Sequence, residues 1–323
     1  MAENNSINHI APEFTSTEFI STDFISAESV PYTFGRVLSS PHLRTIGLRC
    51  IASIFRNFFF LQSRAAFLPG LIPVSRVDHP LDNKIPFLPS KVNIYLDFVA
   101  FWVRAVGFLL RRCGRKALEP AQNFLETMGD LYALAAEVYR KNLSTTERPF
   151  YIKRPRFLLI HALDPHLMCI PSLHVMVVIR TYTLFAEILK LIGEEERFAQ
   201  NVEELRHGAL AITEAVLYIK QHSVNCIPAA MYAMTKFDSK LFPPEEAERF
   251  ASNIFSDAEK LDKAEVLEIR ERIVSLYRRF LDQSQASGNS VDWTEPLLAF
   301  LKEHPRTEPQ SVASMMRSPP LLK

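Results

Sequence analysis

Residues 173–192 read LHVMVVIRTYTLFAEILKLI, an apolar run long enough for a helix of about five turns. A second apolar helix is predicted over residues 208–235. The polar stretch between them, Gly193 to Arg206, is expected to form an exposed connection or a surface helix. Upstream, Glu119 to Lys141 carries apolar residues on one side, which predicts an amphipathic helix. The centre of the chain is therefore expected to be a set of packed helices.

The composition favours a mostly helical core. The chain has 323 residues, of which 48% are apolar, so it can bury a large core. Only 9 glycines are present, and few hairpins or glycine-rich phosphate loops are expected. We predict an all-α fold.

Charge and cysteine content exclude several kinds of partner and site. The chain has 37 basic and 36 acidic residues, a net charge of +1, which gives no overall field to attract nucleic acid. The cysteines have neither Cys-x-x-Cys pairing nor zinc spacing, and they define no disulfide framework. They are Cys50, Cys113, Cys169 and Cys226. No nucleic-acid partner is expected.

The chain divides into four predicted segments. A five-residue repeat that begins at Ser16 marks the first as a low-complexity tail, and a change of composition after Pro243-Pro244 marks the third. The segments are a disordered tail over 1–40, a helical domain over 41–240, a helical C-terminal appendage over 241–305 and a disordered tail over 306–323. In the appendage, Asp262 and Glu265 resemble a capping box before an apolar stripe.

Residues 51–110 leave two interpretations open. The segment is rich in Phe, Leu, Ile and Val, yet charged residues such as Arg56 and Asp97 interrupt its apolar runs. Its helices either contact a membrane or form the core of a soluble protein. No signal peptide is recognised at the N-terminus. We expect association with a membrane, with a soluble cytoplasmic protein as the alternative.

Three short motifs supply the groups that a phosphate-transfer site requires. They are Lys141-x6-Arg148-Pro149, Pro171-Ser172-Leu173-His174 and Lys220-Gln221-His222. A phosphoryl group in transfer carries charge on its equatorial oxygens, so cationic groups and hydrogen-bond donors must converge on it. The two lysines and the arginine supply charge, and the serine supplies a hydroxyl. A histidine can attack phosphorus or protonate the leaving oxygen near neutral pH.

These motifs resemble the signature of the type 2 phosphatidic acid phosphatase and vanadium haloperoxidase superfamily: Lys-x6-Arg-Pro, Pro-Ser-Gly-His and Ser-Arg-x5-His-x3-Asp. The first motif matches in full. Leu173 replaces the glycine of the second, as in the lipid phosphatase and inositol phosphorylceramide synthase-like branch. In the third motif Ala215 and Val216 stand at the Ser and Arg positions, and Cys226 stands at the Asp position. The resemblance covers residues 95–235.

The resemblance implies an α-helical bundle of the phosphatase and haloperoxidase type and a mechanism that needs no metal and no cofactor. His222 would be the nucleophile that forms a phosphohistidine, and His174 the general acid and then base. The implied phosphate ligands are Lys141, Arg148, Ser172 and Lys220. The substrate would be a phosphomonoester or diphosphate, with a lipid phosphate favoured because residues 51–110 are apolar.

Cys226 keeps a second function open. The family Asp orients the nucleophilic imidazole and stabilises its positive charge, and a thiol is a poor replacement unless it is ionised. Loss of such a carboxylate in a comparable triad costs on the order of 10⁴ in rate. The alternative is a degenerate member that binds phosphate or lipid headgroups, or acts as a scaffold whose protein partners the sequence does not identify.

Other chemically suggestive residues have simpler interpretations. The basic residues Lys153, Arg154 and Arg156 are expected to form a solvated turn. The group His161, Asp164 and His166 looks like a metal cluster, but its loop-like surroundings favour a structural role. Cys169 and Cys226 are expected to be small buried side chains rather than reactive thiols.

Overall fold

The computed structural model describes residues 24–68, 70–149, 151, 153–258, 260–286 and 292–307. These described residues are 71% helical and contain only a two-stranded sheet, which confirms the all-α prediction. The long helices are α1 Val30–Ser39, α2 Pro41–Ile54, α3 Phe60–Phe67, α5 Phe98–Arg112, α6 Leu118–Tyr139, α7 Pro155–Leu163, α8 Leu173–Leu191, α9 Ala199–Tyr218, α10 Cys226–Phe237, α11 Pro244–Asn253, α12 Lys263–Ala286 and α13 Glu295–Lys302. Shorter elements are η1 Ile25–Ala27, η2 Phe55–Phe59, η3 Pro80–Asn83, η4 Pro89–Lys91, α4 Val92–Leu96, η5 Gly114–Ala117, β1 Val74–Arg76 and β2 Leu143–Thr145.

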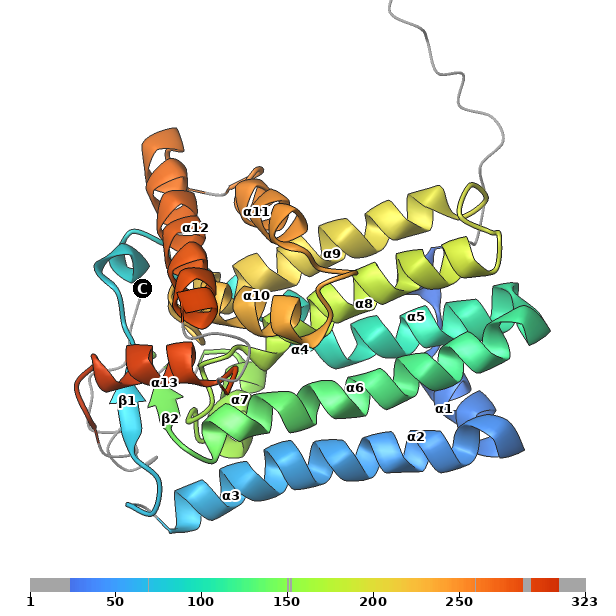
Figure 1. Ribbon diagram of the computed structural model, residues 1–323, viewed down its shortest axis with the longest axis horizontal. Coiled ribbons are helices and arrows are strands. Elements are labelled where there is room, and N and C mark those ends of the chain that lie inside the picture. The colour runs from blue at the N-terminus through green and yellow to red at the C-terminus, as the bar shows by residue number, and fades with distance from the viewer. Residues whose placement is uncertain are drawn as a thin grey trace, which may run out of the picture.

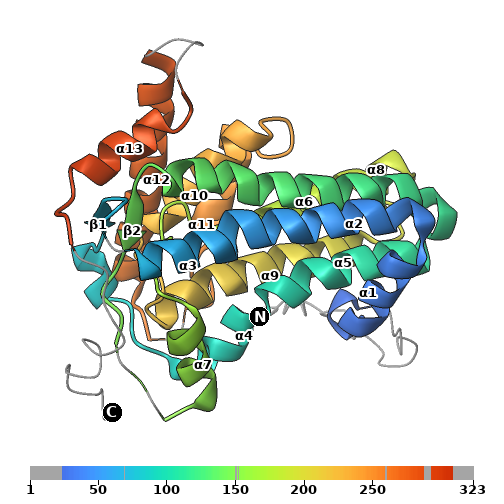
Figure 2. The same cartoon turned by 90° about the horizontal axis from the view of Figure 1, so that it is seen from below.

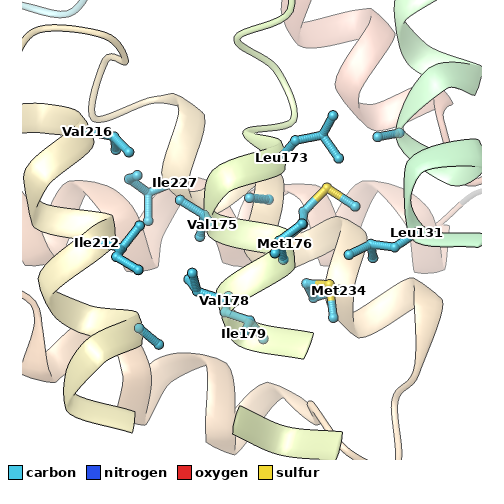
Figure 3. Close-up of a cluster of buried hydrophobic side chains, with 14 of the residues drawn as sticks. Leu131, Leu173, Val175, Met176, Val178, Ile179, Ile212, Val216, Ile227 and Met234 are labelled. Carbon is cyan, nitrogen blue, oxygen red and sulfur yellow. The ribbon is translucent and has the colours of Figure 1, made fainter. Parts of the chain in front are cut away.

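Helix α8 is the central element of the bundle. It contacts α5, α6, α9 and α10, and Figure 1 shows it running along these neighbours. Its apolar residues point in several directions into one core, and Figure 3 shows side chains of α6, α9 and α10 gathered around Met176 and Ile179. A helix that is apolar all round must be buried all round. The run that predicted a helix over 173–192 therefore forms the centre of the fold.

Two predicted helices have the expected bounds, and one does not. Helices α6 and α8 match the predictions over 119–141 and 173–192 to within two residues. The prediction of one helix over 208–235 is wrong, because α9 ends at Tyr218 and α10 begins only at Cys226. Lys220 in the break has a φ of 57°, a left-handed conformation that an α-helix does not allow. The break separates His222 from both helices.

The N-terminal tail is shorter than predicted. Residues 1–23 lie outside the described residues, but η1 and α1 fall within the segment 1–40 that was expected to be disordered. Helix α1 packs on α5 and α2, and Glu28 forms an ion pair with Arg111 at 2.9 Å. Gly107 of α5 gives α1 room, since its Cα faces Thr33 directly. Burial against α5 stabilises a segment whose composition alone indicated a tail.

The C-terminal helices share the core of the bundle. The capping box is present: the Asp262 carboxylate accepts the Glu265 N–H at 2.8 Å, and the Glu265 carboxylate accepts the Asp262 N–H at 3.1 Å. Most of the predicted stripe on α12 is buried, with Ile269, Ile273, Leu276, Tyr277 and Phe280 in the common core. Beyond α13 the chain returns to the sheet, where Arg76 donates its N–H to the Pro305 carbonyl at 2.9 Å. Of the tail predicted over 306–323, residues 308–323 lie outside the described residues.

The parallel strand pair holds the first motif. β1 pairs with β2 so that Val74 is opposite Leu143 and Arg76 is opposite Thr145. β2 lies between Lys141 and Arg148, and both strands are largely buried. The sheet therefore fixes the path of the chain as it leaves α6 for the site.

One segment of the described chain is long and apolar enough to cross a membrane. Residues 89–112 have a mean hydropathy of 1.5 in their most apolar window, and 56% of that window is buried inside the protein. The segment also contains the ion pair between Arg104 and Asp97, whose atoms lie 2.7 Å apart. The segment qualifies as a possible membrane span by its length and composition alone, and a buried core helix of a soluble protein can have the same length and composition.

Substitution of Gly107 tests the packing of α1 on α5. A Cβ at this position would overlap Thr33 Oγ1 and lie 3.3 Å from Thr33 Cβ, so Gly107→Ala should destabilise the protein by about 1–3 kcal/mol. Gly35→Ala is the matched control, because nothing lies within 4 Å of its added Cβ on the outer side of α1. It should stabilise the helix by about 0.5–1 kcal/mol. Urea unfolding of both variants measures the difference, and equal stabilities would contradict the α1–α5 contact.

Candidate active site

The predicted catalytic residues lie where α8 begins. Ser172 is the N-cap residue of α8 and His174 lies in its first turn. His222 lies in the break between α9 and α10. The serine is fully buried, and His222 is 8% exposed. Two segments about fifty residues apart in the sequence therefore meet at one helix terminus.

Three side chains of the two motifs are in contact through one atom. His222 Nε2 lies 3.3 Å from Ser172 Oγ and 3.4 Å from His174 Nδ1. Ser172 makes no capping hydrogen bond to its own helix, so its hydroxyl is available to the imidazole. The structure thus brings together Ser172, His174 and His222; their catalytic roles stay predictions.

Backbone contacts hold His222 in place. Val216 accepts hydrogen bonds from the N–H groups of Gln221 and His222, at 3.0 and 3.2 Å, which closes the break into a tight turn. The Asp82 carboxylate accepts the Val224 N–H at 2.8 Å and joins the turn to η3. The turn is fixed at both ends, so the imidazole is presented by rigid backbone rather than by a mobile loop.

Arg148 brings buried positive charge to the site. Its side chain is 1% exposed, and one of its N–H groups donates to Gln221 Oε1 at 3.2 Å, next to His222 in the sequence. Another donates to the Asp164 carbonyl at 2.8 Å, and the Asp164 carboxylate lies 3.9 Å away. Burial lowers the pKa of Arg148 and Asp164 offsets part of this, but a guanidinium stays charged at neutral pH.

The ammonium groups of the two lysines are directed elsewhere. Lys141 forms an ion pair with Asp292 and donates to Thr294 Oγ1 at 2.9 Å, in the segment before α13. Lys220 donates to the carbonyls of Asp82 and Ile85. Burial lowers the pKa of Lys220, and the Asp82 carboxylate partly offsets that shift. The assignment of both lysines as phosphate ligands stays a prediction.

Aromatic rings enclose His174. Its imidazole stacks on Tyr95 with ring centroids 4.5 Å apart and contacts Phe98 at 4.2 Å. Burial among these rings lowers the pKa of His174 well below its ordinary value of 6.5, and the neighbouring His222 adds to the shift. His174 is therefore neutral at pH 7 when no anion is bound beside it. Sequence reasoning did not identify Tyr95 or Phe98, because no motif marks them.

The Cys226 thiol has a partner other than His222. His222 Nδ1 is buried and meets no geometric hydrogen-bond criterion among the described residues, while the Cys169 thiol interacts with the His222 side chain. The Cys226 thiol instead interacts with Cys169, and both cysteines are free and buried. Burial raises the pKa of Cys226 well above 9.0, and Cys169 raises it further, so the thiol is protonated. A neutral thiol does not supply the negative charge that an aspartate would place here.

The neighbouring polar residues have structural contacts. Asp164 accepts hydrogen bonds from Gln62 at 2.6 Å and from the His166 N–H at 2.8 Å, and His166 Nε2 contacts Thr146 Oγ1 at 2.8 Å. Within the described part of the chain, no three His, Cys, Asp or Glu side chains are grouped so as to hold a metal ion. Of the basic turn, Lys153 and Arg154 are exposed, and Arg156 donates to Asn93.

Comparison with known proteins adds no relative. No family model, no curated protein and no solved structure matches this chain. The chemistry of the site is therefore inferred from its geometry and from its three motifs.

The buried state of His174 predicts a pH dependence of stability. Because its pKa is lower in the folded than in the unfolded protein, the unfolded chain binds the proton more readily below pH 6.5. The free energy of unfolding should therefore fall as the pH is lowered from 7 towards 5. His174→Gln should reduce that slope by up to about 1.4 kcal/mol per pH unit.

Urea unfolding at several pH values measures this slope. His161, whose pKa burial lowers to about 4, contributes in the same direction and remains present in both proteins. The control is His207→Gln, which removes an exposed imidazole from α9. An unchanged slope in His174→Gln would contradict the buried, neutral state of this ring.

Proposed function

We propose that the protein cleaves or transfers a phosphoester through a phosphohistidine on His222. The observation that carries the proposal is the shared contact of His222 Nε2 with Ser172 and His174. A nucleophilic nitrogen, a hydroxyl donor and a second imidazole at one point are the groups that metal-free phosphoryl transfer requires. The family resemblance of the three motifs supports the same chemistry.

The charge around this point favours a phosphate group. The first N–H groups of α8 have no partners within their helix, and a helix N-terminus attracts anions. Arg148 adds a buried guanidinium that reaches Gln221, the residue before His222. Positive charge and aligned N–H groups in a site of low exposure stabilise the spreading negative charge of a phosphoryl transition state.

The proposed reaction has two steps. In the first, the lone pair of His222 Nε2 forms a bond to phosphorus while the bond to the leaving oxygen breaks, and that oxygen takes a proton from His174. In the second, His174 removes a proton from water or an alcohol, whose oxygen displaces His222 from phosphorus. His174 must be protonated for the first step, and a bound phosphate dianion beside it favours the imidazolium that burial otherwise suppresses.

The proposed substrate class is a lipid phosphate. Tyr95 and Phe98 contact His174 and give the site an apolar side. The apolar segment 51–110 supplies both rings, and an acyl or isoprenoid chain would be accommodated by apolar surface near the phosphate. The reaction class is therefore phosphoric ester hydrolysis or transfer on a phosphomonoester or diphosphate.

Turnover assays test the nucleophile and its orientation. Release of phosphate from phosphatidic acid, an isoprenoid diphosphate and an aryl phosphate in EDTA should be slow in the wild type and absent in His222→Ala. Cys226→Asp should raise the rate by up to the order of 10⁴-fold, because a carboxylate would hold the proton on Nδ1 and stabilise charge on the ring. Cys226→Asn is the matched control, since it has the shape of aspartate without the charge.

The proposed catalytic function would be contradicted if no folded variant, including Cys226→Asp, released phosphate. A buried aspartate without full compensation is destabilising. Circular dichroism and thermal melting must therefore show that Cys226→Asp and Cys226→Asn are both folded at the assay temperature.

The alternative function is a phosphate or headgroup-binding protein without efficient turnover. The surroundings of His222 Nδ1 favour it, because the described residues place no carboxylate there to select the tautomer in which Nε2 is free to attack. Lys141 is engaged with Asp292, and Lys220 with the carbonyls of Asp82 and Ile85, which is also compatible with a site that has lost its catalytic arrangement. Binding would then depend on Arg148 and the α8 N-terminus.

Binding of orthovanadate tests the phosphate site without turnover. Calorimetric titration should detect binding to the wild type, and Arg148→Met should weaken it about tenfold or more because a charge-assisted hydrogen bond is lost. The control is Arg154→Met, which removes an exposed guanidinium from the nearby turn. Equal affinity in both variants would exclude Arg148 as a phosphate ligand.

A further inference from the structure

The segment between Glu28 and Asp78 has an unusual distribution of charge. It contains no aspartate, no glutamate and no lysine, and its cationic side chains before β1 are all arginines. These are Arg36, Arg44, Arg49, Arg56 and Arg64. All five are exposed, and none forms an ion pair with another described residue. The rest of the chain has nearly balanced charge, so this concentration is local.

The helix in the middle of this segment carries aromatic residues on its outer side as well as arginines. α2, η2 and α3 form one continuous helix over 41–67 along one outer side of the bundle (Figure 2). Its inner side buries apolar residues such as Leu43 and Leu61 together with two polar groups: Asn57 accepts from Arg140 and donates to Ser53 at 3.0 Å, and Gln62 donates to Asp164. Its outer side carries phenylalanines. The outer side of a helix on a water-soluble surface is normally polar or charged.

The exposed aromatic residues form the second component of this surface. Phe55 is 59% exposed, Phe60 is 67% exposed and Phe67 is 83% exposed. Phe59, Leu48, Leu68 and Leu71 add further exposed apolar area along the same segment, at 46%, 52%, 51% and 61%. Single exposed apolar residues need no explanation, but a series along one helix marks a site of interaction.

We propose that this Phe/Arg surface, the outer side of α2–η2–α3, docks on an anionic phospholipid bilayer. Phenylalanine rings insert at the boundary between headgroups and acyl chains, and arginines on the same surface reach lipid phosphates while their stems lie along apolar surface. The helix lies in the plane of the interface and does not cross it. This inference goes beyond the proposed phosphate chemistry and does not depend on it.

Charge complementarity selects the bilayer over a second copy of the chain. Two such surfaces in a symmetric dimer would bring eight arginines together without a carboxylate on the same helices to balance them, and like charges across an interface are unfavourable. An anionic bilayer supplies phosphates over the whole length of the helix. It also accommodates rings at irregular spacing, because a fluid interface needs no matching pockets.

The same helix joins the surface to the candidate active site. Gln62 donates to the Asp164 carboxylate, and the Asp164 carbonyl and carboxylate both contact Arg148. One side of α3 thus contacts the network around the buried guanidinium while the other carries exposed phenylalanines. Docking through α3 would bring the site to the lipid surface.

Vesicle sedimentation tests the proposal with the full chain. The wild type should sediment with mixed phosphatidylserine–phosphatidylcholine vesicles, less with pure phosphatidylcholine, and binding should weaken as salt is added. Two double variants change the Phe/Arg surface. In Phe59→Ser with Phe67→Ser, each lost phenylalanine should weaken partitioning into the vesicles about tenfold. Arg49→Gln with Arg56→Gln should also weaken binding to the anionic vesicles.

The controls change the same residue classes on other faces. Leu191→Ser with Leu267→Ser removes exposed apolar side chains from α8 and α12, and Lys190→Gln with Lys302→Gln removes exposed charge. Both double variants should bind as the wild type does. His222→Ala should also bind, which separates failure of docking from failure of the phosphate chemistry.

Three outcomes would overturn the proposal. The first is a wild type that does not bind anionic vesicles. The second is a loss of binding in the control variants as large as in the Phe/Arg variants. The third is a wild-type dimer in light scattering that dissociates in Phe59→Ser with Phe67→Ser, because the surface would then be a protein interface.

Discussion

The contact between a rigid turn and a helix N-terminus is the constraint on which this molecule depends. The Val216 carbonyl accepts hydrogen bonds from two successive N–H groups, those of Gln221 and His222, and these bonds form a tight turn after α9. His222 Nε2 is thereby held against Ser172 and His174 at the start of α8. Helix α8 is itself fixed by burial among α5, α6, α9 and α10, so the site has the rigidity of the core (Figure 3).

The electrostatics of the site are unequal on the two sides of the His222 imidazole. On the Nε2 side, hydroxyl, imidazole and helix N–H groups converge, and Arg148 lies one side chain away through Gln221. The Nδ1 atom is buried and has no carboxylate partner among the described residues; Cys169 interacts with the His222 side chain and with the protonated Cys226 thiol. In the proposed function, binding of an anion would use the first side, whereas nucleophilic attack would use both. Under that proposal, position 226 decides the balance between binding and catalysis.

Particular elements show how far the sequence predicts this fold. α6 and α8 were predicted because their apolar residues recur at helical spacing, and the α12 capping box was predicted because Asp262 and Glu265 have the required separation. The break over 219–225 was not predicted, because apolar stretches flank it on both sides and the left-handed Lys220 is not a glycine or asparagine that would mark it. Helix α1 was missed because its stability comes from contact with Gly107 and its neighbours on α5.

The sequence by itself determined the helical class and the chemical types available for the site, since periodicity and motif spacing are local properties of the chain. Only the tertiary structure decided which of those groups meet. It brought Ser172, His174 and His222 together and directed Lys141 to Asp292 and Lys220 to the carbonyls of Asp82 and Ile85. It also turned Phe55, Phe59, Phe60 and Phe67 of η2 and α3 outward. The physical reason is that a side chain's partner depends on packing between distant segments, which spacing along the chain does not specify.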